Sequence, residues 1–317
     1  MKNFLLVSLV AFGLSWVFCL LLIPILRRLK AGQNILVYVK EHKSKSGTPT
    51  MGGLAFVFAA TLATVIFVKR ADKTLIITLA IALSYMSVGF LDDYLKCKHK
   101  QNLGLTPRQK FTFQTCIAVF AGIYCYRAGL SNLYLPFTKI YMRLGWGIIP
   151  LTVFVFLATV NAVNLTDGLD GLAGGVSTPF FAFFGALILL QNGASTLATV
   201  CFALTGALFA YLLFNSSPAS VFMGDTGSLA LGGFASCVGV FSGNALYIAV
   251  VGLGFVISVI SVVIQVIYYK ATGGKRIFLM SPLHHHFQQK GYSETKIAYA
   301  YSVLTIVLGV TCLLFVL

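Results

Sequence analysis

Long apolar runs alternate with short polar segments along the whole chain. A helix that crosses a bilayer needs about 20 apolar residues, because each residue advances the helix by about 1.5 Å. Apart from their ends, the runs contain no Asp, Glu, Lys, Arg or His. The pattern therefore predicts an all-α, polytopic integral membrane protein with about ten transmembrane helices, approximately at Asn3–Leu26, Gly52–Val68, Thr74–Leu91, Phe111–Tyr126, Gly147–Val163, Leu172–Leu190, Thr196–Phe214, Gly227–Phe241, Leu246–Tyr269 and Thr295–Leu317.

The ninth run is long and contains Gly252 and Gly254, so we expect a bend or a break there. No linker or soluble module interrupts the pattern, which predicts a single transmembrane domain over residues 1–317.

The basic residues predict how the helices are oriented. Ten spans put both termini on one side of the membrane, and the connecting segments then alternate between the two faces. Segments 27–51, 92–110 and 270–294 hold most of the Lys and Arg, whereas 69–73 and 127–146 hold few and 191–195 and 242–245 hold none. With 164–171 and 215–226, which hold none, the first set has 15 Lys and Arg against six in the second. The positive-inside rule therefore places the first set in the cytoplasm and both termini outside, although Lys2 argues weakly for the reverse.

The composition excludes a soluble protein. Hydrophobic residues make up 58% of the chain and charged residues 10%, whereas a soluble domain carries about 25% charged residues. The net charge of +15 would suggest nucleic acid in a soluble protein, but here it fits topology and attraction to anionic membrane lipid. Seven of the eight acids fall on the predicted cytoplasmic side, and Asp72 is the exception. A transporter is a weaker alternative, because carriers place ionisable groups near the midplane.

The segment LDDYLK at the end of the third run places two carboxylates side by side. Neither Asp92 nor Asp93 is favourable near lipid unless a cation lies close. Lys96 lies four and three residues further on, so it shares their helical face. An ordinary ion pair at a helix end would also explain this segment.

The segment NLTDGLDGLAGG joins two runs with almost no loop. Asn164, Asp167 and Asp170 recur every three residues, which predicts that they lie on one helical face. The next helix directs its N-terminus at this turn, and such termini bind phosphates. Local capping accounts for one aspartate but not for all of them.

Three further motifs lie on the same predicted face. FMGDTGS presents one carboxylate, Asp225, which by itself would be a helix cap. PLHHHF holds three consecutive histidines, which cannot all bind one metal, so contact with phosphate or proton transfer suits them better. HKSKSGTPTMGG is basic and rich in glycine. Together these segments offer carboxylates for Mg²⁺ and cations for phosphate, without any P-loop or dinucleotide-binding motif.

The motifs GTPTMGG (47–53), LDDYLK (91–96), NLTDGLDGLAGG (164–175), FMGDTGSLALGG (222–233) and PLHHHF (282–287) resemble those of the polyprenyl-phosphate N-acetylhexosamine-1-phosphate transferases, in the same order. PLHHHF favours the branch that transfers phospho-N-acetylmuramoyl-pentapeptide over the branch that transfers N-acetylglucosamine-1-phosphate, which stays the alternative. Gln288 departs from the glutamate expected there.

The resemblance implies a Mg²⁺-dependent transfer at the cytoplasmic face of the bacterial plasma membrane. The donor would be UDP-N-acetylmuramoyl-pentapeptide and the acceptor undecaprenyl phosphate. It implies that Asp225 binds Mg²⁺ and that Asp92 and Asp93 act at the reacting phosphates. The implied substrate-binding residues are Lys45, Thr50, Lys96, Asn164, Asp167, Gly168, Leu169, Asp170, Asn215, Phe222 and Gln265, with His284 (also expected to be catalytic), His285 and His286 at the phosphate and sugar end.

Two mechanisms stay open from the sequence. A phosphate monoester with a second pKa of about 6 is mostly dianionic at neutral pH and can attack directly. A route through an aspartyl-phosphate is the competitor. The sequence does not fix the oligomeric state, and a homodimer is compatible with it.

Overall fold

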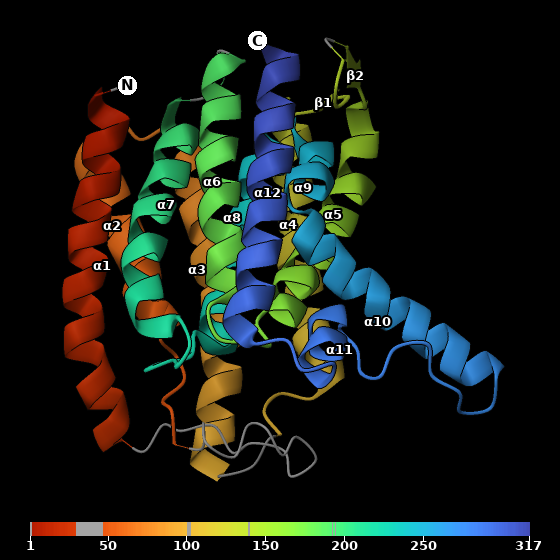
Figure 1. Cartoon of the computed structure of the whole chain (residues 1–317). Helices are drawn as coiled ribbons and strands as arrows, with labels where there is room; N and C mark the ends of the chain where they lie inside the picture. The colour runs from red at the N-terminus through yellow and green to blue at the C-terminus, as the bar shows by residue number, and fades with distance from the viewer. Residues whose placement is uncertain (1, 30–46, 100–102, 139, 192, 194) are drawn as a thin grey trace.

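A computed structural model describes residues 2–29, 47–99, 103–138, 140–191, 193 and 195–317 of the chain. Most of them form a bundle of roughly parallel helices, with both termini at the same end, and the helix over 253–271 leans out of this bundle (Figure 1). The helices are α1 (Lys2–Arg28), α2 (Gly53–Phe67), α3 (Lys73–His99), α4 (Pro107–Arg127), α5 (Ile148–Thr166), α6 (Leu172–Leu190), α7 (Ser195–Asn215), α8 (Gly224–Phe241), α9 (Ala245–Val251), α10 (Leu253–Ala271), α11 (Leu283–Gln289) and α12 (Glu294–Val316).

The helices confirm the all-α fold. Each predicted span coincides with one helix, except that the ninth coincides with α9 and α10. These two helices meet at Gly252, so the predicted break is confirmed. Among the described residues, seven helices are long and apolar enough to cross a membrane, and α2 is a shorter apolar helix. The protein is therefore a multi-pass membrane protein, and ten crossings stay a prediction.

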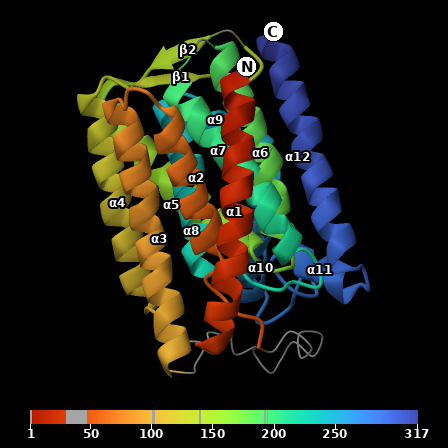
Figure 2. The ribbon, with the colours of Figure 1, turned by 90° about the vertical axis from the view of Figure 1, so that its left-hand side faces the viewer.

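The segment between α4 and α5 contains a small β-hairpin that the sequence did not predict. Strands β1 (Asn132–Tyr134) and β2 (Tyr141–Arg143) pair antiparallel, with Leu133 opposite Met142. The hairpin lies at the end of the bundle that carries the termini (Figure 2). The opposite end of the bundle carries α11 and the C-terminal end of α3. The predicted motifs gather at that end.

Helix α8 forms the centre of the bundle. From Thr226 to Phe241 each of its residues is buried, and α2, α3 and α5 pack around it. The close approach depends on glycine: a Cβ on Gly89 of α3 would overlap the carbonyl oxygen of Asp225, and Gly53 of α2 meets Gly227 of α8 in the same way. Small residues permit such packing in membranes, where helix association relies on close contact.

Helix α1 packs against α2 and α7 on the outside of the bundle (Figure 2). Gly206 in α7 lies directly against the carbonyl oxygen of Ser8, and the Ser8 hydroxyl donates to the carbonyl oxygen of Phe202 at 2.8 Å. The Ser15 hydroxyl donates to the carbonyl oxygen of Ala207 at 2.8 Å, about two helical turns further along α1. These contacts place the backbones of α1 and α7 side by side.

We expect Gly206→Ala to force α1 away from α7 and to destabilise the protein by about 1–3 kcal/mol, as overpacking does in other cores. The measurement is the thermal midpoint of the purified protein in detergent. Gly13→Ala is the matched control, because a Cβ on Gly13 in α1 would meet no atom within 4 Å. Equal midpoints for the two variants would contradict the close packing described above.

Candidate active site

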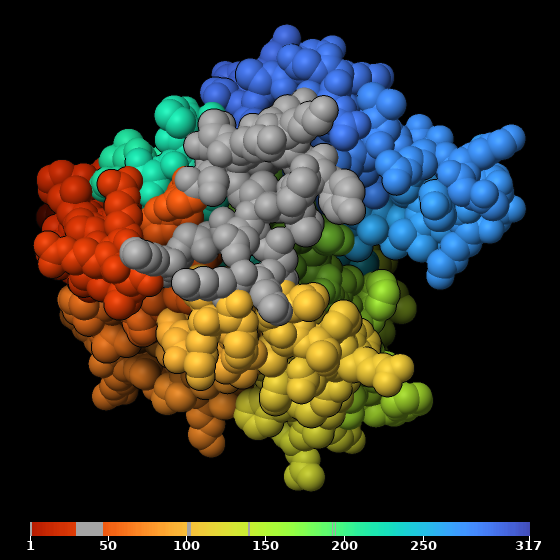
Figure 3. Space-filling view, turned by 90° about the horizontal axis from the view of Figure 1, so that it is seen from below, coloured from red at the N-terminus to blue at the C-terminus, as the bar shows by residue number. Residues whose placement is uncertain are grey.

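Three predicted aspartates converge at the end of the bundle opposite the termini. Asp92 and Asp93 come from the last turns of α3, and Asp225 comes from the first turn of α8. One carboxylate oxygen from each lies within 4.8 Å of the others. Figure 3 views the molecule from this end, where segments of α3, α4 and α10–α12 surround the face. Residues that are 132 positions apart in the chain thus form one cluster.

Two lysines neutralise most of this acidic charge. Lys96 Nζ lies close to Asp92 Oδ2, at 2.6 Å, and to Asp225 Oδ2, at 3.1 Å. This confirms that Lys96 faces the aspartates from the same helix. Lys110 Nζ lies 2.8 Å from the same oxygen of Asp225. Two ammonium groups therefore lie among the three carboxyl groups, and both contact Asp225 Oδ2.

Asp93 has a different role from that of Asp92, because its carboxylate binds the N-terminus of α8. It accepts hydrogen bonds from the backbone N–H of Asp225 at 3.2 Å, from the backbone N–H of Thr226 at 2.9 Å, and from the Thr226 hydroxyl at 2.7 Å. A carboxylate at this position also interacts favourably with the helix dipole. Asp93 thereby fixes the position from which Asp225 extends.

Asn164, at the end of α5, completes the surroundings of Asp225. Its Nδ2 donates to Asp225 Oδ1 at 2.8 Å and to Ser228 Oγ at 2.8 Å. Lys110 Nζ donates to Asn164 Oδ1 at 3.5 Å. The position of Lys110 follows from local sequence, since Thr106 caps α4 with a capping box and starts the helix just before it. Both Asp225 oxygens are thus held by groups from three other helices.

The predicted helical face of Asn164, Asp167 and Asp170 is wrong. Helix α5 ends at Thr166, and Asp167 is its non-helical C-cap. Gly171 then adopts φ 72°, which a residue with a side chain rarely does, and starts α6. Asp170 Oδ2 accepts from the backbone N–H of Ala219 at 3.0 Å, away from the Asn164 amide. Because α5 ends before Asp167, the three-residue spacing does not place these side chains on one helical face.

Asp167 keeps part of its surface exposed, yet its carboxyl group is desolvated. Burial raises the pKa of Asp167 well above its ordinary value, and the negative charges of Asp225, Asp93 and Asp170 act in the same direction. Asp167 consequently favours the protonated form more than an exposed aspartate does, and it can donate a hydrogen bond as well as accept one.

His284 is fully buried beside the turn that follows α5. An ideal Cβ on Gly168 would lie 2.5 Å from His284 Nε2 and 2.9 Å from His285 Nε2, so only glycine fits there without displacement. Among the described residues, neither ring nitrogen of His284 has a hydrogen-bond partner. Buried polar atoms without partners are uncommon and need an explanation, and a bound substrate would supply one.

The other two histidines have protein partners. His285 Nδ1 lies 3.0 Å from Gln288 Oε1, and His286 Nδ1 accepts from the backbone N–H of Leu279 at 3.1 Å. Gln288, the residue that departs from the family pattern, also donates from Nε2 to Glu294 Oε1 at 3.1 Å. A glutamine can donate there, whereas a glutamate facing Glu294 would repel it.

The remaining predicted residues differ in how the structure uses them. Thr50 is buried, and an ideal Cβ on Gly224 would lie 2.5 Å from its hydroxyl oxygen, whereas Leu169 is buried in the turn itself. Phe222 pairs its backbone with Pro49 and Gly52. The amides of Asn215 and Gln265 bind backbone groups, Asn215 at Val221 and Gln265 at 277–278. Lys45 lies outside the described residues.

Sequence reasoning missed Lys110, Thr226, Ser228 and Glu294. Glu294 Oε2 accepts from the backbone N–H of Asp170 at 2.9 Å and joins α12 to the turn. Thr226 and Ser228 follow Asp225 directly, so the motif contained them without indicating their partners. Lys110 follows a capping Thr-Pro, and that cap would have placed it in a first helical turn facing the membrane surface.

Comparison with known proteins defines the class first. The model of glycosyl transferase family 4 matches residues 75–243, and signature 1 of the phospho-N-acetylmuramoyl-pentapeptide-transferases matches residues 45–57. The matched region contains Asp92, Asp93 and Asp225, and it identifies the chain as a membrane-embedded phosphotransferase.

The curated relatives define the family. A phospho-N-acetylmuramoyl-pentapeptide-transferase of Listeria innocua is 44% identical over 296 residues, which cover 91% of this chain and 90% of the relative. One of Clostridium perfringens is 45% identical over 288 residues, which cover 90% and 88%. The chain belongs to the phospho-N-acetylmuramoyl-pentapeptide-transferase family.

The burial of His284 leads to a prediction about how the stability of the protein depends on pH. Desolvation, with a smaller contribution from His285, lowers the pKa of His284 to about 3. In the unfolded chain the His284 ring binds a proton with a pKa near 6.5, whereas in the folded protein it stays neutral until about pH 3. Folding is therefore not penalised above pH 6.5, and the free energy of unfolding decreases as the pH falls from 6.5 toward 3. At pH 5 the loss is roughly 2 kcal/mol.

We therefore expect the thermal midpoint of the wild type to fall between pH 7 and pH 5 more steeply than that of His284→Gln. His99→Gln, which removes an exposed histidine from the end of α3, is the control and should keep the wild-type slope. Parallel slopes for wild type and His284→Gln would show that the ring titrates normally.

Proposed function

We propose that this protein transfers phospho-N-acetylmuramoyl-pentapeptide from UDP to undecaprenyl phosphate. The products would be UMP and the first lipid intermediate of peptidoglycan. The observation that carries the proposal is the convergence of Asp92, Asp93 and Asp225 with two lysines at one end of a membrane bundle, in a chain of this family. The names of the relatives favour this donor over UDP-N-acetylglucosamine.

The proposal includes where the reaction takes place. Residues 1–317 would act as one transferase domain in the bacterial plasma membrane, with the aspartate cluster at the cytoplasmic face and both termini outside. The uneven distribution of Lys and Arg supports this orientation. A site at the membrane surface suits the reaction, because the nucleotide donor is soluble and the lipid acceptor is not.

The aspartate cluster suits a divalent cation. Mg²⁺ is usually bound by one or two carboxylates together with phosphate oxygens of the substrate. Asp225 would hold it, and the two ammonium groups already gathered at Asp225 Oδ2 support a place for positive charge there. Bound Mg²⁺ would neutralise the pyrophosphate and stabilise the leaving phosphate.

The lysines would bring two anions together. An acceptor phosphate and a donor pyrophosphate repel each other, and this repulsion is the main obstacle to the reaction. Lys96 and Lys110 both lie within 3.1 Å of Asp225 Oδ2, so their positive charge is concentrated where the phosphates would meet. Each can exchange its carboxylate partner for a phosphate oxygen.

The geometry around Asp92 supports direct attack by the acceptor phosphate on the sugar-linked phosphate. Asp92 Oδ1 accepts from the backbone N–H of Leu105 at 2.8 Å, and Oδ2 is paired with Lys96. A carboxylate engaged at both oxygens is a weak nucleophile. Asp92 would instead position the acceptor or accept its residual proton, and Asp93 would act indirectly by holding α8.

The donor would bind along the turn after α5. Gly168, Leu169 and Asp170, with Phe222, would hold the uracil and ribose, and His284 would turn its unpartnered nitrogens to the phosphate and sugar. The further residues proposed to bind substrate are Lys45, Thr50, Asn164, Asp167, Asn215, Gln265, His285 and His286.

We expect Asp225→Asn to lower Mg²⁺-dependent release of UMP by roughly a hundredfold or more, because it removes a carboxylate from the centre where charge develops. The assay is UMP formation by the purified protein with both substrates over a range of Mg²⁺ concentrations. Asp72→Asn makes the same chemical change at the opposite end of the bundle and serves as the control. Unimpaired turnover by Asp225→Asn would remove the metal assignment.

Direct attack predicts that UMP appears only when the lipid acceptor is present. In rapid-quench measurements with the UDP donor alone, the wild type should release no stoichiometric burst of UMP, and adding undecaprenyl phosphate to the same sample should start release. A burst without acceptor that disappears in Asp92→Asn would establish the aspartyl-phosphate route instead.

A further inference from the structure

A second polar site lies at the end of the bundle opposite the aspartate cluster. It is a cavity of about 530 Å³ between the start of α1, the end of α2 and the start of α7. Its size falls in the range of ordinary ligand pockets. The residues that line it come from 2–7, 67–70 and 195–199. The proposed transfer reaction uses none of them.

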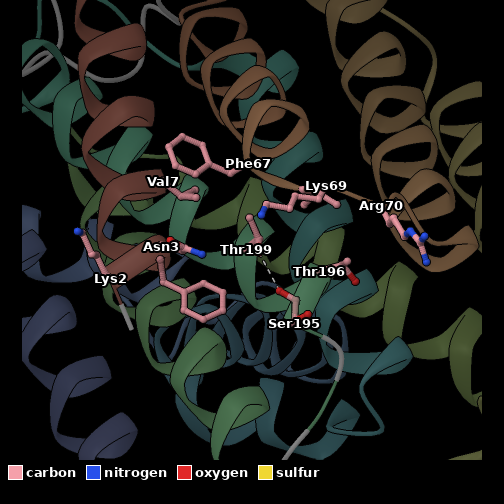
Figure 4. A pocket seen from close by; sticks show the side chains of 11 residues that line it. Lys2, Asn3, Val7, Phe67, Lys69, Arg70, Ser195, Thr196 and Thr199 are labelled. Atoms are coloured by element: carbon pink, nitrogen blue, oxygen red, sulfur yellow. Dashed lines mark hydrogen bonds between the residues drawn. The ribbon is translucent and has the colours of Figure 1, made fainter.

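The polar part of this cavity is strongly cationic. Lys2, Lys69 and Arg70 come from two segments far apart in the sequence. Figure 4 shows Lys69 extended toward Thr199, whereas Lys2 and Arg70 lie at opposite edges of the cavity and point away from Lys69. The start of α7 adds the positive end of a helix dipole. These cations lie on the face that we assign to the outside of the membrane. The positive-inside rule predicts few Lys and Arg on that face, so the rule does not explain why they are present.

The acidic residue beside the cavity does not neutralise these cations directly. Asp72 Oδ1 accepts from the backbone N–H of Leu75 at 2.7 Å, and Oδ2 accepts from the Thr196 hydroxyl at 2.9 Å. Both oxygens are therefore used to cap α3 and to tie it to α7. In the sequence, Asp72 is the one acid in the segments assigned to this face.

The apolar part of the cavity continues into the lipid-facing surface. Phe4, Val7 and Phe67 line the inner wall. Directly along the same helices, α1 exposes Leu5 and Leu9 and α2 exposes Leu62, Val65 and Ile66. A cationic pocket at the ends of helices, above exposed apolar side chains, matches a molecule with an anionic head and hydrocarbon chains.

We propose that this cavity binds the headgroup of an anionic phospholipid from the leaflet on the termini side, with Lys69 at the phosphate, Lys2 and Arg70 at the rim, and the acyl chains along α1 and α2. A bound lipid would join α1, the α2–α3 connection and α7, and would stabilise the folded protein by mass action. The inference is independent of the proposed transfer reaction.

The test uses the full-length protein in detergent, with native mass spectrometry and thermal midpoints as readouts. Wild type should retain phosphatidylglycerol in preference to phosphatidylcholine. Lys69→Gln/Arg70→Gln should weaken retention of phosphatidylglycerol by roughly tenfold to thirtyfold, since each cation near an anionic lipid contributes about a fivefold effect. The matched control is Arg127→Gln/Arg143→Gln, which removes the same charge from the neighbouring connection on that face and should bind as wild type does.

Three outcomes would overturn the proposal. Equal retention of the two lipids by wild type would show that charge does not select the ligand. Equal losses in both double variants would show a diffuse surface effect. Stabilisation by glycerol 3-phosphate as strong as that by phosphatidylglycerol would identify a soluble anion in place of a lipid. Lys2→Gln replaces the double variant if that protein is not monodisperse.

Discussion

The hydrogen bonds between the Asp93 carboxylate and the first turn of α8 hold the two halves of the candidate site together. Inside a membrane protein the N–H groups at a helix start cannot rely on bulk water, so a partner must come from the protein. Asp93 supplies it from α3, and Asp225 is thereby brought to Asp92. The close contact of Gly89 with the Asp225 backbone allows this approach. One interaction thus serves both the packing of α8 and the assembly of the carboxylates.

The charges of the site are arranged for exchange of partners. Lys96 and Lys110 share one oxygen of Asp225, and Asn164 holds the other. In surroundings of low polarity neither ammonium group would be stable without an anion. Phosphates that enter the cluster offer such anions, and the carboxylates they displace become available to a metal ion. The same groups can therefore stabilise the protein before substrates bind and stabilise the phosphates afterwards.

The elements that the sequence predicted well are those set by local pattern. Apolar runs located the helices, Gly252 the break between α9 and α10, and the spacing of Asp92 and Lys96 their ion pair. Contacts between distant segments were not predictable in this way. Lys110 meets Asp225 only after folding, and the short strands of the hairpin carry no periodic signal. Asn164, Asp167 and Asp170 have helical spacing in the sequence, but α5 ends at Thr166 and the backbone turns at Gly171.

The burial of α8 has a consequence for how the protein is made. This helix is absent from the described helices that are apolar and long enough to span a membrane by themselves, and it starts next to a carboxylate. It is instead surrounded by α2, α3 and α5. All three precede it in the chain. During synthesis from the N-terminus, α8 therefore emerges after the helices that surround it, and the Asp93 carboxylate that binds its polar first turn is already part of the chain.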